Sequence, residues 1–197
     1  MRIALILLVF LMACAQNTPS HQTEKTPNSN KTDSLSILPK DKIAVRFDFP
    51  VGKPDAKGYY NAQKFGANLH LGDDWNAVTG GNSDLGDPIF SIANGYVDFA
   101  ENYGGGWGNV IRITHHLPDG QKIESLYAHC DTIFVQMNKW VKRGDKIGTI
   151  GTANGAYLAH LHLEIRDSLM PIGGGYSDDQ AGFLDPTHFI KSHRKIP

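Results

Sequence analysis

The segment 160–165 reads His-Leu-His-Leu-Glu-Ile, so polar and apolar side chains alternate without interruption. Strict alternation is typical of a β-strand with one face in a core, because successive side chains of a strand point to opposite sides. The pattern predicts a strand over 160–166 whose core face carries Leu161, Leu163 and Ile165. The opposite face then presents two imidazoles and a carboxylate, from His160, His162 and Glu164.

The rest of the chain also has the pattern of a β protein. Short β-branched or alternating runs are separated by turn residues about every ten positions. Asn94-Gly95 predicts a hairpin between 89–92 and 96–100, and Pro118-Asp119-Gly120 predicts one between 110–114 and 122–128. A tight turn is expected within 141–148. Because no long stretch has helical periodicity, we expect an all-β, mainly antiparallel fold.

Three glycine-rich segments have the composition of loops. They are 79–86, 104–108 and 172–175. Gly104-Gly105-Gly106 lacks the Lys-Ser/Thr of a phosphate-binding loop, so we expect these segments to rim a substrate groove instead.

Three of the expected strand or loop segments carry histidines. His70 and Asp74 are four residues apart, an even separation that permits a shared side, and alternation puts Tyr127 and His129 on one face. Together with the 160–166 strand, these segments can bring four imidazoles and one carboxylate to one concave sheet surface. Zinc enzymes that hydrolyse amides typically use three protein ligands and keep a fourth position for water. The five side chains fit a one-zinc site with two histidines left uncoordinated.

The same residues resemble the motifs of a known family. His70 to Asp74 reads His-x-Gly-x-Asp, 127–129 reads Tyr-Ala-His, and 160–162 reads His-Leu-His. These resemble the three motifs of the lysostaphin/LytM-type peptidoglycan metalloendopeptidases. The segments 86–97, 141–148 and 184–186 resemble further family segments, so the resemblance covers about residues 60–190. It implies a sandwich or groove of the duplicated-hybrid-motif type.

The resemblance also implies a role for each site residue. By it, one Zn²⁺ per domain is bound by His70, Asp74 and His162, while His129 and His160 are uncoordinated catalytic histidines. The implied substrates are the stem-peptide cross-links of bacterial peptidoglycan. This agrees with the chemistry, because zinc acidifies a bound water and a neutral imidazole can take its proton. The division of proton transfers between the two histidines stays open.

Some side chains keep two interpretations. Tyr127 can donate to the oxyanion or pack in the groove wall, and Glu164 can orient a metal ligand or pair with Arg166. Cys130 follows His129 where the family has leucine, and alternation predicts a buried apolar thiol there. Two further departures are expected to leave the ligands in place: Ala159 for proline, and Leu163 for an aromatic residue.

Two other functions compete with the zinc endopeptidase. One is a noncatalytic peptidoglycan-binding protein or amidase activator. Members of that kind have typically lost metal ligands, whereas all five site residues are present here. The other is a D-Ala-D-Ala-type zinc carboxypeptidase, which ranks last because it would need a longer spacing than that between His70 and Asp74.

The N-terminus has the features of an export signal. Residues 1–14 contain Arg2, an apolar run too short to span a bilayer, and an ending at Cys14 that resembles a bacterial lipobox. We therefore expect a lipoprotein signal in 1–14, a flexible tether in 15–40 and a metalloendopeptidase domain in 41–197. Ala15 and Gln16 provide no obvious inner-membrane retention residue. This favours the outer membrane of a Gram-negative bacterium and, by family analogy, D-Ala–diaminopimelate cross-links.

Charge and cysteine content exclude further classes. The net charge is −1 and no basic cluster appears, so nucleic acid is not an expected partner, and the only expected membrane contact is the N-terminal lipid. The chain has two cysteines. If Cys14 carries a lipid, Cys130 has no partner, so we expect the fold to depend on its core, with the metal as a further support.

Overall fold

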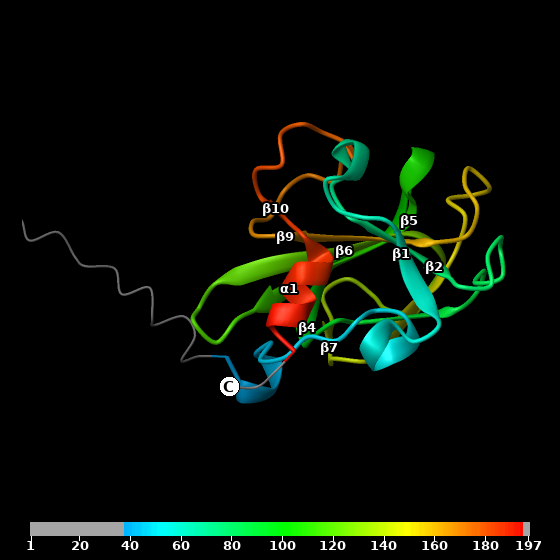
Figure 1. Ribbon diagram of the computed structural model, residues 1–197. Helices are drawn as coiled ribbons and strands as arrows, with labels where there is room; N and C mark the ends of the chain where they lie inside the picture. The colour runs from blue at the N-terminus through cyan, green and yellow to red at the C-terminus, as the bar shows by residue number, and fades with distance from the viewer. Residues whose placement is uncertain (1–37, 195–197) are drawn as a thin grey trace, which may run out of the picture. The chain divides into compact units, whose positions relative to one another are not determined.

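The computed structural model describes residues 38–194 (Figure 1). The expected signal segment with Cys14, and the tether up to residue 37, lie outside the described residues. Among the residues described, no helix is long and apolar enough to cross a membrane.

The described residues form ten strands. They are β1 (Tyr59–Gln63), β2 (Asp73–Ala77), β3 (Pro88–Phe90), β4 (Gly95–Gly104), β5 (Gly108–His116), β6 (Lys122–Ile133), β7 (Trp140–Val141), β8 (Lys146–Ile150), β9 (Leu161–Arg166) and β10 (Phe183–Leu184). The helical elements are α1 (Pro186–Ser192) and four short turns, η1 (Lys40–Lys42), η2 (Gly52–Ala56), η3 (Ala67–Leu69) and η4 (Gly105–Trp107).

All paired strands are antiparallel, as the sequence predicts. The main path of the sheet is β1-β2-β9-β6-β5-β4-β7. β10 adds to β9, and β8 joins β3 to β6. The long strand β6 lies between β9 and β5 in the main path (Figure 1). It also pairs with β8, so it connects the β3-β8 pair to that path.

The hydrophobic core lies on the face of β9 that the alternation predicts. Leu161, Leu163 and Ile165 are fully buried in a cluster with side chains from β3, β5, β6 and β8. Helix α1 lies against β9 and adds Phe189 and Ile190 to this cluster. The strand therefore has its apolar side chains fixed in the core, which directs its polar side chains to the other face.

One of the two predicted hairpins forms. β5 and β6 pair with each other around the Pro118-Asp119-Gly120 turn, which confirms the second hairpin. The predicted hairpin at Asn94-Gly95 does not form, so that prediction is wrong. β3 pairs with β8, whereas β4 pairs with β5 and β7. Neither Asn94 nor Gly95 has the positive φ that the tight turn requires.

Distant contacts explain this difference at Asn94 and Gly95. The Asn94 side-chain amide donates to the carbonyl of Ile43 at 3.2 Å, and its oxygen accepts from the Arg143 N–H at 2.9 Å. A Cβ on Gly95 would lie 2.4 Å from the Ile113 side chain. The dipeptide is therefore used for close packing between distant segments and not for a local turn.

A buried polar chain crosses the core around His115. Its Nδ1–H donates to the Asn94 carbonyl at 2.9 Å, and its Nε2 lies 2.7 Å from the Ser125 hydroxyl. The Ser125 hydroxyl in turn lies 3.1 Å from that of Tyr127. Burial lowers the pKa of His115 to about 4. The folded state therefore holds this imidazole neutral.

The free energy of unfolding should depend on pH through His115. Its pKa is lower in the folded state than in the unfolded chain, so its stabilising contribution is complete above pH 6.5 and is lost as the pH falls towards 4. The loss corresponds to about 3 kcal/mol. Urea unfolding at several pH values should show a flatter acid limb for His115→Gln than for wild type, whereas His188→Gln, at an exposed position, should follow wild type. Parallel curves for wild type and His115→Gln would contradict the assignment.

Candidate metal centre

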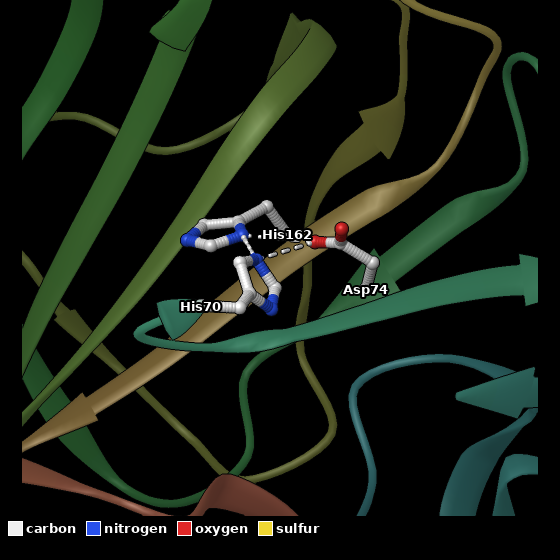
Figure 2. Close-up of side chains that lie close together, drawn as sticks. All are labelled: His70, Asp74 and His162. Atoms are coloured by element: carbon white, nitrogen blue, oxygen red, sulfur yellow. Dashed lines mark hydrogen bonds and ion pairs between the residues drawn. The ribbon is translucent and has the colours of Figure 1, made fainter. Parts of the chain in front are cut away.

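Three donor groups converge where β2 lies beside β9. Asp74 on β2 pairs directly with His162 on β9, and His70 ends the turn η3 just before β2. The Asp74 Oδ1 lies 2.9 Å from His162 Nδ1 and 3.3 Å from His70 Nε2, and the two nitrogens are 3.0 Å apart. Figure 2 shows the three side chains turned towards one another. Among the described residues, this is the one group of three histidine, cysteine or acidic side chains whose arrangement suits a metal ion.

Gly72 makes this approach possible. A Cβ on Gly72 would lie 2.5 Å from the Leu163 carbonyl oxygen and 2.9 Å from His162 Cε1. Both distances are shorter than ordinary contacts, so a side chain here would push the His70–Asp74 segment away from β9. The glycine of the His-x-Gly-x-Asp motif is therefore required by packing.

The three groups perturb one another's protonation. Burial opposes ionisation of Asp74, but hydrogen bonds with His162 and His70 outweigh it and hold the pKa of this carboxyl well below its usual value. Burial likewise opposes protonation of His162, but its hydrogen bonds to Asp74 and Glu164 raise the pKa of this imidazole to about 9. The site therefore favours positive charge between these groups. Two imidazole nitrogens and a carboxylate oxygen are also donors that zinc accepts.

Two further histidines lie beside the donors. The ring centroids of His129 and His160 are 4.7 Å apart, and that of His129 is 5.6 Å from that of His162. Each ring donates its Nδ1–H to a backbone carbonyl, His129 to Trp107 at 3.3 Å and His160 to Leu158 at 2.8 Å. In the neutral form, Nε2 is then the free acceptor of each ring. Burial lowers the pKa of His129 to about 3, so this ring is neutral at pH 7.

The structure brings all five predicted histidine and aspartate side chains to one cavity. This cavity has a volume of about 550 Å³ and is partly open to solvent. Its other walls include Trp107, Tyr157 and Tyr176. Of the glycine-rich segments, 104–108 and 172–175 line the cavity, as predicted, whereas no residue of 79–86 does.

Tyr127 does not contribute to the site, so the prediction of an oxyanion or groove-wall contact is wrong. Its side chain is fully buried in the core, and its hydroxyl accepts from the Ile92 N–H at 3.1 Å. The assumed alternation fails because His129 has a φ of 61° and the β5–β6 register shifts beside it. The backbone therefore turns His129 towards the cavity while Tyr127 stays on the core face.

The other two sequence interpretations also have an outcome. Cys130 is buried in the core, which confirms the predicted buried thiol, and it forms no disulfide among the described residues. Glu164 pairs with Arg166 through Oε2, and its Oε1 accepts from His162 Nε2 at 3.1 Å.

No sequence pattern predicted the aromatic walls of the cavity. Tyr176 lies beside His70, with ring centroids 5.2 Å apart, and Tyr157 lies 5.0 Å from His129. Both tyrosines are about half exposed and sit in irregular loops, where no periodicity predicts their direction. Trp107 belongs to a loop that the glycine content does identify.

Comparison with known proteins identifies the family. The model of peptidase family M23 matches residues 69–174, just over half of the chain. The chain therefore belongs to peptidase family M23, and the resemblance to the lysostaphin/LytM-type enzymes is confirmed.

Two curated relatives are similar to part of this chain. "Lipoprotein NlpD" of Yersinia enterocolitica is 44% identical over 81 residues, which cover 41% of this chain and 78% of that protein. "Murein hydrolase activator NlpD" of Escherichia coli K12 is 38% identical over 96 residues, 46% of this chain and 24% of that protein. The chain thus spans only about a quarter of the second relative.

Among solved structures, the antimicrobial peptidase lysostaphin from Staphylococcus simulans has the same fold. It aligns with a TM-score of 0.51 and 21% identity, covering 79% of this chain and 55% of the other. The predicted all-β, mainly antiparallel fold is therefore confirmed.

The convergent donors predict that the protein binds one divalent metal ion. Zinc should raise the unfolding temperature of the wild type, because a ligand that binds only the folded state stabilises it. At a zinc concentration of 1,000 times Kd, the free energy of unfolding should rise by about 4 kcal/mol. Asp74→Ala and His162→Ala should lose this effect, and His188→Ala should keep it. Thermal unfolding with and without zinc, with metal analysis of the dialysed proteins, tests this. Equal zinc content in wild type and both ligand variants would contradict the site.

Proposed function

We propose that this protein is a zinc-dependent endopeptidase that hydrolyses the peptide cross-links of bacterial peptidoglycan. The observation that carries the proposal is the division of five side chains in one open cavity. Three of them present metal donors to one another, and two histidines beside them keep a free ring nitrogen. Membership of a peptidase family supports amide hydrolysis as the reaction.

In this proposal His70, Asp74 and His162 hold the zinc ion. When bound, zinc lowers the pKa of water and polarises the scissile carbonyl. The three residues would hold the ion beside an open cavity, which suits a catalytic zinc site that keeps one position for water. Glu164 holds the Nε2–H of His162, which leaves Nδ1 as the nitrogen that faces Asp74.

His129 and His160 handle the protons. With Nδ1–H donated to a carbonyl, the Nε2 of a neutral ring can accept the proton of the attacking water, and a protonated ring can deliver it to the leaving amine. Their ring centroids are 4.7 Å apart, so both can act on one scissile bond. The 3.9 Å between His160 Nε2 and Asp74 Oδ1 places this ring at the edge of the metal donors.

The cavity walls suit a peptide substrate. Trp107, Tyr157 and Tyr176 supply aromatic surfaces, and Gly106, Gly174 and Gly175 keep the walls free of bulky side chains. An extended peptide can lie against such walls with its backbone near the histidines. We propose D-Ala–diaminopimelate cross-links as the substrate, in keeping with the proposed location in a Gram-negative envelope.

Replacing either proton-handling histidine should slow hydrolysis strongly without removing zinc. His129→Ala and His160→Ala should lower kcat/KM by about 10²- to 10⁴-fold, the usual contribution of general acid–base catalysis. Mass spectrometry of muropeptides released from purified sacculi measures the rate and identifies the bond, with chelator-treated wild type and His188→Ala as controls. Full activity of His129→Ala would refute its catalytic role.

A second function is favoured by the name of one relative. The similarity to a "Murein hydrolase activator" supports an activator that binds peptidoglycan or a partner amidase without cutting cross-links itself. The same muropeptide assay separates the two functions. If zinc-loaded wild type leaves every cross-link intact but raises the activity of a purified amidase, and His129→Ala does so equally, the activator function is correct.

We further propose that the protein is anchored to the bacterial envelope through a lipid on Cys14. The lipobox-like ending of 1–14 supports this, as does the similarity to a protein named a lipoprotein. Cys14→Ala should abolish incorporation of radiolabelled palmitate and move the protein out of the membrane fraction. Membrane association of Cys14→Ala equal to wild type would refute the anchor.

A further inference from the structure

Behind the metal donors lies a group of buried charges, here called the charge cluster: Arg112, Glu124, Glu164 and Arg166. These residues come from the adjacent strands β5, β6 and β9. Glu124, Glu164 and Arg166 are fully buried, and Arg112 is 20% exposed. Arg166 pairs with Glu164 and lies 3.9 Å from Glu124, which pairs with Arg112. Buried charges are costly unless they are paired, so Arg166 and Glu164 hold each other in place.

Glu164 connects the charge cluster to the metal donors. One carboxylate oxygen accepts from His162 Nε2 at 3.1 Å, and the other accepts from Arg166 Nε at 2.8 Å. The orientation of the His162 ring therefore depends on the position of the Arg166 guanidinium. Partners of this kind, one bond beyond the ligands, are known to tune metal affinity.

The same guanidinium also contacts the loop that leads to one wall of the cavity. Arg166 Nη1 donates to the carbonyls of Met170 and Pro171, each at 3.4 Å. Both belong to the loop 167–176, whose end lines the cavity with Gly174, Gly175 and Tyr176. Arg112 Nη1 donates to the Met170 carbonyl at 3.0 Å, so the loop is fixed from two sides.

We propose that Arg166 is a positioning residue that couples the metal ligand His162 to the loop 167–176. It uses Nε and Nη2 for Glu164 and Nη1 for the loop. Because a guanidinium is planar and rigid, a displacement on one side is transmitted to the other. The inference rests on the zinc site of the proposed function. Metal binding and the shape of the substrate wall are then linked through the Arg166 side chain.

The test compares Arg166→Lys with Arg112→Lys. Lysine keeps the positive charge but cannot contact Glu164 and the loop with a rigid fork. Arg112 is the matched control, because it touches the same loop carbonyl but has no hydrogen bond to Glu164. Three measurements are made: zinc affinity by competition with a chelator, the absorption spectrum of the cobalt-substituted protein, and hydrogen exchange of amides in 168–173 with and without zinc.

The expected results differ between the two variants. In the wild type, zinc should slow exchange in 168–173, because coupling between two sites is reciprocal. Arg166→Lys should lower zinc affinity by about 10- to 100-fold, shift the cobalt spectrum and lose the zinc-dependent protection. Arg112→Lys should exchange faster in the loop, yet keep wild-type zinc affinity, cobalt spectrum and zinc-dependent protection.

Glu164→Gln provides a second variant that preserves side-chain shape if Arg166→Lys does not fold. This substitution removes the carboxylate charge that joins His162 to Arg166. Zinc affinity and the zinc-dependent protection of amides in 168–173 should therefore fall again. If either folded variant binds zinc like wild type, or keeps zinc-dependent protection of the loop, the coupling is refuted and the charge cluster only stabilises the fold. If wild type itself binds no zinc, the proposed function fails instead, so the two failures are distinguishable.

Discussion

The close pairing of β2 with β9 is the contact on which the rest of the site depends. It places Asp74 directly opposite His162, and it is possible because Gly72 has no side chain to collide with the Leu163 carbonyl. On the other face of β9, leucines and an isoleucine are locked in the core, so the strand cannot rotate or slip without exposing them. Hydrophobic packing of β9 therefore fixes the positions of the metal donors.

A second layer of polar contacts supports these donors from behind. His162 is held by Glu164, and Glu164 by Arg166, all of them almost completely removed from water. In such surroundings each bond is strong and each loss is costly, which makes the arrangement rigid. His129 is placed differently, by a backbone with positive φ that turns its ring from β6 into the cavity. The centre therefore combines rigid strand positions with one special backbone conformation.

Much of this was predictable wherever local pattern and tertiary environment agree. The strand β9, its two faces and the β5–β6 hairpin follow from period-two alternation and a local turn. The predictions for Tyr127 and for the Asn94-Gly95 hairpin fail for a common reason. Each extrapolates a regular local geometry across a position where distant segments impose another one, a register shift beside His129 and close packing of Gly95 against β5.

The sequence by itself determined the fold class, the family motifs and which side chains could serve as metal donors or free imidazoles, because these depend on residue type and short-range spacing. Only the tertiary structure decided that His70, Asp74 and His162 meet within hydrogen-bonding distance, that His129 and not Tyr127 faces the cavity, and that tyrosines from two loops form its walls. Those outcomes depend on strand pairing and buried charge between residues far apart in the chain, and such long-range contacts leave no periodic signal in the sequence.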